Sequence, residues 1–153
     1  MDNESLKSKI TAWEPDATFV EEGSQFLNVI ITPEKVLNLA NKLRFDENML
    51  FDFMFCLTCV DYPDHFMMVY HLRSIKNKHE MVLKVKIDNK EKPEVETLSA
   101  IWRTAEYHER EVYDLFGVVF LNHPDLRRIL LDEEWVGHPL RKDYVDTVNM
   151  ISL

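Results

Sequence analysis

Three apolar segments in the middle of the chain are joined by very short connections, and this spacing constrains the fold more than any other feature. The segments are Leu50–Val60, Phe66–Leu72 and Met81–Ile87, with turn residues at Asp61–Asp64 and Ser74–Lys78. Links of this length join antiparallel neighbours, because a parallel crossover needs a dozen residues or more. The sequence therefore predicts a three-stranded antiparallel meander.

The side-chain patterns of these strands assign them different places in the sheet. Leu50–Val60 is apolar on both faces, which is typical of a central strand covered on both sides. In Met81–Ile87, by contrast, Lys84 and Lys86 alternate with apolar residues, so we expect one largely solvated face.

Further elements are expected on either side of the meander. Thr32 is a suitable N-cap and Pro33 is tolerated in a first turn, so a helix should run from there to about Arg44. A second helical region should end at Gly117, which can adopt a left-handed C-cap conformation. Before the meander we expect a helix at Ser5–Trp13 and strands at Thr18–Val20 and Gln25–Thr32, with Gly23 in their turn. After it we expect a charged loop at Asp88–Glu96, the second helical region at Leu98–Phe116 and a short strand at Val118–Leu121. The second helical region should break near Arg103, and its apolar stripe consists of Ile101, Ala105, His108, Val112 and Leu115.

These elements predict an α+β fold: a two-layer domain in which helices pack on a mainly antiparallel mixed sheet, followed by an irregular extended C-terminal segment. A chain of 153 residues suits one domain with a real core. We expect residues 1–121 to form the α+β domain and residues 122–153 to form a partner-docking segment of the same domain. That segment lacks a helical or strand period, yet its apolar residues must pack on this domain or on another chain. These residues are Leu126, Ile129, Leu130, Leu131, Trp135, Leu140 and Tyr144.

Composition excludes several classes of function. A net charge of −9 argues against a nucleic-acid partner, because phosphate binding needs a cationic surface. The two cysteines are too few for the four ligands of an iron–sulfur cluster, and the three glycines lie too far apart for a phosphate-binding loop.

The most apolar window, Met49–Val60, is too short to span a membrane, and the N-terminus does not have the pattern of a secretory signal. We expect a cytosolic protein that reaches a membrane only through a partner.

Cys56 and Cys59 form a CxxC pair, which occurs in zinc sites and in redox pairs. In a regular strand, however, residues three apart point to opposite faces. Neither a second CxxC nor a following helix is present, so two small core residues are the favoured interpretation.

Six histidines are present, and His123 and His138 each precede a proline near several acidic residues. A metal site is conceivable. The two are separated by fifteen residues of irregular chain, so histidines that bond to the backbone are the favoured interpretation.

Glu109, Arg110 and Glu111 could serve as acid–base residues, but consecutive helical positions lie about 100° apart and cannot share a face. A structural charge network is favoured instead. Arg110 has Glu106 and Asp114 one turn away on either side. Glu109 lies beside the apolar stripe, where an unpaired carboxylate is costly, so it should need a cation. The candidates are Arg127, Arg128 and Arg141.

Two basic pairs, Arg127-Arg128 and Arg141-Lys142, stand out in this acidic chain. They are interpreted either as solvated surface or as a docking site for an acidic or polar partner. Arginine, tryptophan and tyrosine often anchor interfaces, and Trp135 and Tyr144 lie in the same segment.

Several motifs follow one another in a dense and ordered run: Glu109-Arg110-Glu111-Val112-Tyr113-Asp114-Leu115-Phe116-Gly117, His123-Pro124-Asp125-Leu126-Arg127-Arg128-Ile129-Leu130, Trp135 and Gly137-His138-Pro139-Leu140-Arg141-Lys142-Asp143-Tyr144, with Val60-Asp61-Tyr62-Pro63 earlier in the chain. This run resembles the C subunit, the 30 kDa subunit family, of the proton-pumping NADH:quinone oxidoreductase, respiratory complex I. The resemblance is weaker before residue 50.

This resemblance implies a protein that binds no cofactor, whereas FMN, iron–sulfur clusters and quinone are held by partner subunits. It further implies packing against the quinone-site D subunit, near the cluster-bearing B and I subunits, on the cytoplasmic side of the cell membrane. No catalytic, cofactor-binding or metal residue is expected. The expected partner-interface residues are Glu109, Arg110, Glu111, Tyr113, Asp114, Phe116, Gly117, His123, Pro124, Asp125, Arg127, Arg128, Trp135, His138, Pro139, Arg141, Lys142, Asp143 and Tyr144.

The function predicted from the sequence is that of a non-catalytic structural subunit of a bacterial NADH:quinone oxidoreductase. Two alternatives stay open at this point. One is the equivalent subunit of a membrane-bound hydrogenase-type or other donor:quinone complex. The other is an autonomous enzyme that uses Glu109, His123 or His138.

Overall fold

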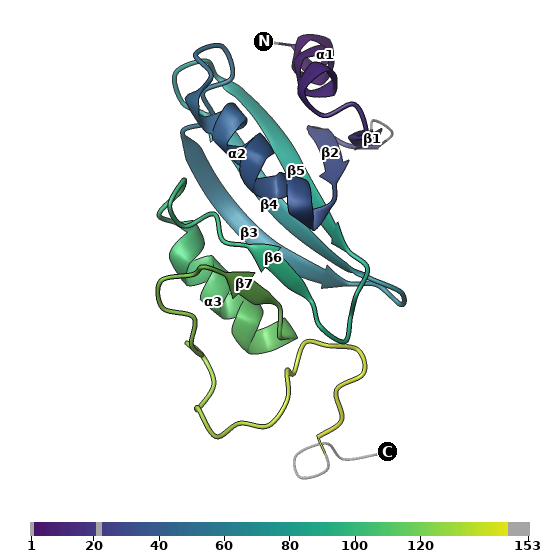
Figure 1. Ribbon diagram of the computed structural model, residues 1–153, viewed down its shortest axis with the longest axis vertical. Helices are drawn as coiled ribbons and strands as arrows, with labels where there is room; N and C mark the ends of the chain where they lie inside the picture. The colour runs from purple at the N-terminus through teal and green to yellow at the C-terminus, as the bar shows by residue number, and fades with distance from the viewer. Residues whose placement is uncertain (1, 21–22, 147–153) are drawn as a thin grey trace.

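The predicted meander lies within a five-stranded mixed sheet (Figure 1). In the computed structural model, which describes residues 2–20 and 23–146, the strand order is β1-β2-β5-β4-β3. Strands β3 (Phe53–Asp61), β4 (Phe66–Ser74) and β5 (His79–Ile87) pair antiparallel, as expected. Strand β2 (Leu27–Ile31) pairs parallel with β5, and β1 (Thr18–Val20) pairs antiparallel with β2.

Strand β3 was expected at the centre of the sheet with both faces covered, and this prediction is wrong. It begins at Phe53 rather than Leu50, and it forms the edge of the sheet. Phe53 and Phe55 point to the uncovered face and are 40% and 37% exposed. Apolar residues on both faces of a strand do not distinguish a covered central strand from an edge strand with an open apolar face. A register irregularity between Met54 and Cys56 also shifts the side-chain period of β3 by one residue.

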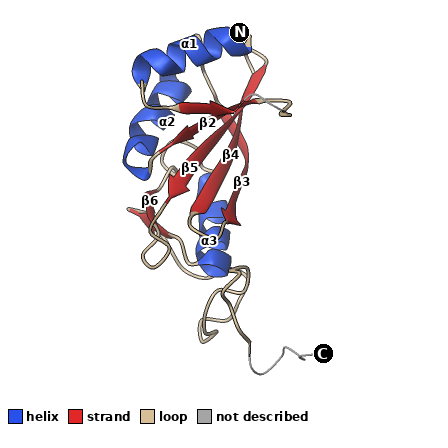
Figure 2. Ribbon diagram, turned by 90° about the vertical axis from the view of Figure 1, so that its right-hand side faces the viewer, coloured by secondary structure: helices blue, strands red, loops and turns tan. Residues whose placement is uncertain are grey.

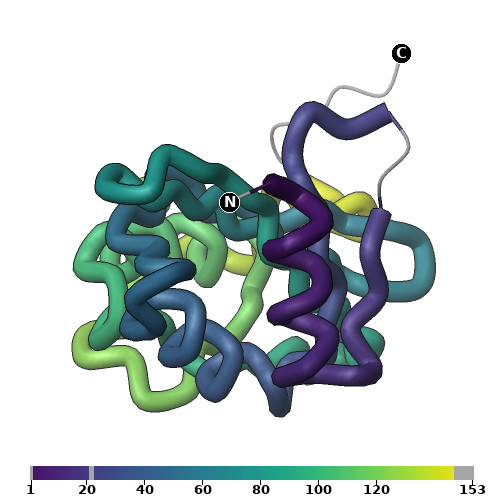
Figure 3. Tube along the Cα trace, turned by 90° about the horizontal axis from the view of Figure 1, so that it is seen from above, coloured from purple at the N-terminus to yellow at the C-terminus, as the bar shows by residue number. Residues whose placement is uncertain are grey.

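Three α-helices pack on one face of the sheet (Figures 1 and 2). These are α1 (Asn3–Trp13), α2 (Val36–Phe45) and α3 (Ala105–Phe116). A short 3-10 helix, η1 (Pro33–Lys35), leads into α2, and Thr32 occupies its N-cap without the expected side-chain hydrogen bond. Seen from above, α1 and α2 lie on the same side of the sheet (Figure 3).

Helix α3 and its surroundings differ from the prediction in two ways. The helix starts at Ala105, because residues 98–104 form turns in which the carbonyl oxygen of Leu98 accepts from Ile101 N and Trp102 N. The expected charged loop also contains strand β6 (Glu94–Glu96), which pairs parallel with the predicted short strand, β7 (Val119–Leu121). A three-residue strand whose partner lies beyond a helix leaves almost no local signal.

The main core lies between the helices and the sheet. Its largest fully buried side chains include Tyr70, Phe51, Phe66 and Phe120. The buried face of α3 is not the expected apolar stripe, because it contains the charged residues Glu109, Arg110 and Asp114. Most of their partners come from the segment that follows β7.

That segment is irregular, as expected: residues 122–146 form neither helix nor strand. It passes the C-terminal end of α3 at the bottom of the view in Figure 1. We call residues 122–146 the tail; residues 147–153 of the predicted segment lie outside the described residues. Within the described part of the chain, no helix has the length and hydropathy of a membrane span.

Candidate partner-docking site

Asp114, in the last turn of α3, is the centre of the contact between helix and tail. Its Oδ2 accepts hydrogen bonds from the backbone N–H groups of Ile129, Leu130 and Leu131 at 3.0, 2.8 and 2.9 Å. Its Oδ1 accepts from Arg128 Nη1 at 2.7 Å. Burial alone would raise the pKa of Asp114, but these bonds together lower it below its ordinary value. The carboxylate is therefore ionised, and both of its oxygens accept hydrogen bonds.

Arg128 closes the next part of the tail into a loop. Its Nη2 donates to the carbonyl oxygens of Trp135 and Gly137, both at 2.9 Å, and its Nη1 also donates to the carbonyl oxygen of Asp114. A guanidinium presents several donors in a fixed plane, so one side chain can hold both ends of a loop. Residues 132–134, between the Asp114 and Arg128 contacts, are exposed.

The tail also caps the C-terminus of α3, where helix carbonyls lack intrahelical partners. Gly117 adopts the predicted left-handed C-cap with φ +75°, and its N–H bonds to the carbonyl oxygen of Tyr113. The Nδ1 of His138 donates to the carbonyl oxygen of Asp114 at 2.9 Å, and Leu140 N donates to that of Leu115 at 3.0 Å. A Cβ on Gly117 would lie 2.5 Å from the imidazole of His138, so that ring requires a glycine beneath it.

Arg110 also bonds to the tail. Its Nε and Nη2 donate to the carbonyl oxygens of Arg127 and Arg128 at 3.2 and 3.1 Å. Among the described residues its ion-pair partner is Asp125, at 3.9 Å, rather than Glu106 or Asp114 as predicted. Asp114 is paired with Arg128 instead.

Glu109 is fully buried. The prediction that an arginine of the tail pairs with it is wrong. Its carboxyl accepts from the Thr97 hydroxyl and from Leu98 N, the latter at 2.8 Å. Burial raises its pKa to about 7, although these two hydrogen bonds act in the opposite direction. Neither Thr97 nor Leu98 is close to Glu109 in sequence, so no local pattern could have identified them.

His123 lies 3.7 Å from Glu109, measured from Nε2 to Oε2. Its Nδ1 accepts from Asp125 N at 3.0 Å, and its Nε2 donates to the carbonyl oxygen of Glu106 at 2.9 Å. An imidazole that accepts at one nitrogen and donates at the other is neutral. His123 and His138 both bond to the backbone, as favoured from the sequence, and the described residues contain no cluster of three or more potential metal-ligating side chains.

The distal part of the tail is attached to the end of the β3–β4 hairpin. Asp61 accepts from Lys142 N at 2.8 Å and pairs with the ammonium group of Lys90. Arg141 donates to the carbonyl oxygen of Lys90 at 3.2 Å, and its guanidinium lies 5.1 Å from the centre of the Phe66 ring. Sequence reasoning missed Lys90, because a lysine in a charged loop has no pattern that indicates a partner 29 residues away.

The other predicted interface residues lie around these contacts. Phe116 is buried against the Phe66 ring, while Tyr113 packs edge-on against His138. Tyr144 lies over Gly137, where an added Cβ would be 2.8 Å from its ring. The remaining positions are the exposed Glu111, Pro124, Asp125, Arg127, Lys142 and Asp143 and the half-buried Trp135 and Pro139.

Several apolar side chains of the tail remain exposed. We call them the tail surface: Ile129, Leu130, Val136, Leu140 and Val145. Their exposed fractions reach 64% at Leu130 and 87% at Val136. The indole N–H of Trp135 is shielded from solvent and has no hydrogen-bond partner among the described residues. Hydrogen bonds thus hold the tail backbone against the domain while these apolar side chains are exposed, an arrangement suited to docking.

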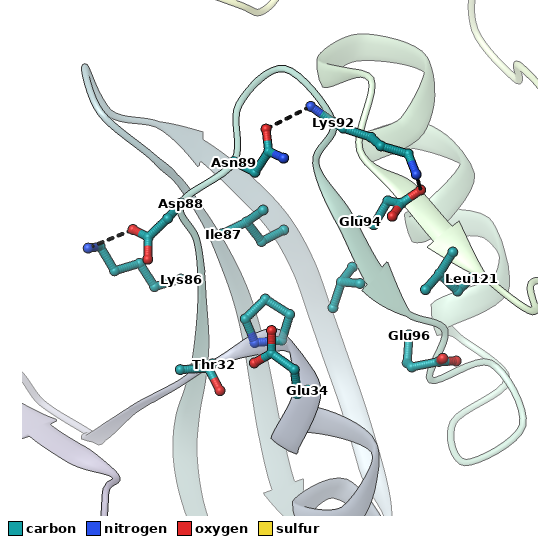
Figure 4. A pocket seen from close by; sticks show the side chains of 12 residues that line it. Thr32, Glu34, Lys86, Ile87, Asp88, Asn89, Lys92, Glu94, Glu96 and Leu121 are labelled. Carbon is teal, nitrogen blue, oxygen red and sulfur yellow. Dashed lines mark hydrogen bonds and ion pairs between the residues drawn. The ribbon is translucent and has the colours of Figure 1, made fainter.

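A cavity lies apart from the contacts between α3 and the tail. It has a volume of about 560 Å³ and lies between η1, the end of β5 and the β6–β7 pair (Figure 4). Its charged lining is largely paired, with Lys86–Asp88 at 2.8 Å and Lys92–Glu94 at 3.1 Å. It does not include any of the predicted interface residues.

The two cysteines lie on opposite faces of β3, as predicted. Cys59 is buried in the main core, whereas Cys56 faces the other side and is half-buried. Burial raises the pKa of the Cys59 thiol to about 12, and the nearby Asp61 adds to this shift. Cys59 is a core residue, as favoured from the sequence, and Cys56 is only partly so.

An α+β domain with a charge-anchored tail is the class of protein that this fold and site define. Residues 29–148 match the family of the 30 kDa subunit of respiratory-chain NADH dehydrogenase. The chain belongs to this family. It is 41% identical to the C subunit of NADH-quinone oxidoreductase from Roseiflexus sp. (strain RS-1) over 94% of this chain and 84% of the relative. It is 43% identical to the C subunit of the Geobacter sulfurreducens enzyme over 91% and 85% of the two chains.

Two further likenesses extend the comparison. A C/D subunit of NADH-quinone oxidoreductase from Phocaeicola vulgatus is 41% identical over 80% of this chain, which corresponds to 24% of that protein. A chain of the membrane-bound sulfane sulfur reductase, an archaeal respiratory membrane complex, has the same fold with a TM-score of 0.78 and 27% identity. That likeness covers 95% of this chain and 86% of the other. The resemblance inferred from the sequence, and with it the α+β fold, is confirmed.

Proposed function

We propose that this chain is a non-catalytic structural subunit of the peripheral arm of NADH-quinone oxidoreductase, and that its tail docks on the D subunit. The observation that carries the proposal is the anchoring of the tail: Asp114 and Arg128 fix its backbone while the tail surface stays exposed. A rigid apolar surface loses little conformational entropy on binding, which favours tight association.

The names of the relatives support the D subunit as the partner. In the Phocaeicola vulgatus protein, a C part similar to this chain is joined to a D part in one polypeptide. Fusion keeps two polypeptides at a high effective concentration, which suits parts that function in contact. Placement on the cytoplasmic side of the membrane, near the cluster-bearing B and I subunits, belongs to the same proposal.

The contribution to electron transfer is indirect in this proposal. The three buried charged groups of α3 are engaged by the tail or by the residues after β6: Asp114 by Arg128, Arg110 by tail carbonyls and Glu109 by Thr97. Their role is to set the shape of the docking surface. FMN, the iron–sulfur clusters and quinone would be held by the other subunits, which this surface aligns.

The test uses the assembled complex, purified through an affinity tag on this chain. Leu130→Asp places a charge in the tail surface and should reduce the recovery of the D subunit at least ~10-fold, because a buried charge at an interface costs several kcal/mol. Ile75→Asp is the matched control. Ile75 is 62% exposed, similar to Leu130 at 64%, but lies in the β4–β5 turn at the opposite end of β4 from the tail.

Equal recovery of the D subunit with both variants would contradict docking through the tail. Arg128 and Arg141 are poor positions for this test, since their side chains hold the tail itself. The non-catalytic role is tested separately. The purified chain should show neither NADH oxidation nor flavin or iron absorbance, and turnover by the chain alone would overturn it.

A second host complex is favoured by one observation, the TM-score of 0.78 to a chain of the sulfane sulfur reductase complex. The higher identity to the C subunits of NADH-quinone oxidoreductases, 41% and 43% against 27%, favours the first proposal. The polypeptides that co-purify with the tagged chain at native abundance decide between them. An NADH-binding flavoprotein supports the first host, and a different electron-donor protein supports the second.

A further inference from the structure

No described helix packs on the face of the sheet opposite α1, α2 and α3. Met67, Val69 and Val82 form a separate small cluster there; they are 9%, 9% and 4% exposed, and Phe26 and Ile30 pack against them. Figure 2 shows α1, α2 and α3 on the other face. A groove of about 440 Å³ crosses this surface, which we call the open face; its lining runs from Val20 in β1 to Val60 and Tyr62 at the end of β3.

Aromatic side chains extend the open face along β3. The rings of Phe53 and Phe55 stack with centroids 6.2 Å apart, and His71 lies 5.5 Å from Phe55 and 6.5 Å from Phe26. Phe53, Phe55, Val60 and Tyr62 are each 37–44% exposed. Several exposed apolar and aromatic side chains grouped beside an apolar groove are typical of an interaction site rather than of solvated surface.

The charges on the open face indicate what covers it. Arg73 pairs with Glu80 at 2.5 Å, and Lys86 pairs with Asp88 at 2.8 Å. Lys84 projects from the middle of the same face, beside Val69 and Ile30 in the strand register, and no carboxylate among the described residues pairs with it. A partner that covers the apolar groove must also neutralise this lysine, because burying an unpaired ammonium is costly.

A second copy of this chain does not meet that requirement. A twofold interface would bring the open face against itself and place one Lys84 near the other. Each chain also carries a net charge of −9, so two copies repel at long range. The occupant is therefore another polypeptide, with apolar side chains for the groove and a carboxylate for Lys84.

We propose that the open face is a second docking site, which binds an apolar segment bearing an aspartate or glutamate from another subunit of the same complex. The inference rests on the proposed assembly. One end of the groove lies near the tail contact, since Tyr62 lines it and the preceding residue, Asp61, accepts from Lys142 N. A complex that contacts the tail is thus positioned to reach round the β3–β4 hairpin onto the open face.

The test is site-specific photo-cross-linking in the purified complex. p-Benzoylphenylalanine is introduced at Phe55 on the open face and, as the control, at Phe45, which is 66% exposed at the end of α2. Irradiation followed by peptide mapping should link position 55, and not position 45, to one segment of another subunit that contains apolar residues and a carboxylate.

A set of lysine variants tests the charge requirement in the same assay. Lys84→Glu should lower the cross-link yield from position 55 by ~5-fold or more, since like charges at an interface are strongly unfavourable. Lys84→Arg should retain the yield. Lys76→Glu, the same charge reversal on the exposed β4–β5 turn, should leave it unchanged.

The outcomes separate this inference from the proposed function. A complex that contains the D subunit but gives no product from position 55, or a product between two copies of this chain, overturns the second site and leaves the tail contact standing. A yield that does not respond to Lys84→Glu also overturns it. If the tagged chain recovers no other polypeptide, both the assembly and the second site are wrong.

Discussion

Asp114 and Arg128 form a buried ion pair of 2.7 Å that joins the last turn of α3 to the tail. The aspartate is fully buried and the arginine side chain is only 13% exposed. Each partner also organises backbone: the carboxylate binds three consecutive N–H groups, and the guanidinium binds the carbonyl oxygens of Trp135 and Gly137. Much of the contact between α3 and the tail therefore depends on one carboxylate.

Asp114→Asn should destabilise the protein by about 3 kcal/mol, because it leaves the Arg128 charge buried without its partner and replaces an acceptor oxygen by a donor. Urea unfolding measures the change. Asp88→Asn removes an exposed partner of Lys86 and should cost no more than ~0.5 kcal/mol. Similar losses in both variants would show that the Asp114 contact contributes little to stability.

Gly117→Ala should cost more than Gly23→Ala, although both glycines have similar left-handed φ angles of +75° and +71°. Gly23→Ala carries only backbone strain, about 1 kcal/mol, because nothing lies within 4 Å of the new Cβ. Gly117→Ala must also displace the His138 ring, which lies 2.5 Å from the new Cβ. The difference in melting temperature between the two variants measures the cost of displacing the His138 ring. Equal losses of stability in both variants would argue against a close contact between Gly117 and His138.

Stability should fall with rising pH because of Glu109. Its pKa is about 7 in the folded protein against an ordinary value of 4.5, so the unfolded chain releases the proton first. The stability that the protonated Glu109 carboxyl contributes is fully present below pH 4.5, declines between pH 4.5 and pH 7, and is lost above pH 7. The free energy of unfolding changes by roughly 3 kcal/mol over this range.

Glu109→Gln should abolish this part of the pH dependence. The difference in unfolding free energy between the variant and the parent chain should therefore grow from pH 5 to pH 8 in favour of the variant. Glu111→Gln, on the exposed side of the same helix, is the control and should show a constant difference. A constant difference for Glu109→Gln would refute the raised pKa.

Alkylation of the folded protein should distinguish the two cysteines. The Cys59 thiol, with a pKa of about 12 and a buried position, should not react with iodoacetamide at pH 8, since the thiolate is the nucleophile. Cys56 is half-buried and should react first. Mass spectrometry of digested protein checks this, and preferential labelling of Cys59 would show that the core around it opens readily.

The candidate site could be predicted as a segment but not as a set of contacts. Spacing along the chain identified Gly117 as the cap of α3, and the long irregular stretch between His123 and His138 favoured histidines that bond to the backbone over a metal site. The partners of Glu109 and Arg110 could not be predicted in this way. The helical period predicts which residues share a face of the helix, but it does not predict which residues of other segments pack against that face.

The sequence by itself determined the meander, the helix end at Gly117 and the family, because turn length, backbone conformation and motif order are local properties of the chain. Only the tertiary structure decided that β3 lies at an edge, that Thr97 and not an arginine meets Glu109, and that Lys84 lies on an uncovered apolar face. These depend on which distant segments come together, and the same alternation of apolar residues is compatible with a covered face or an open one.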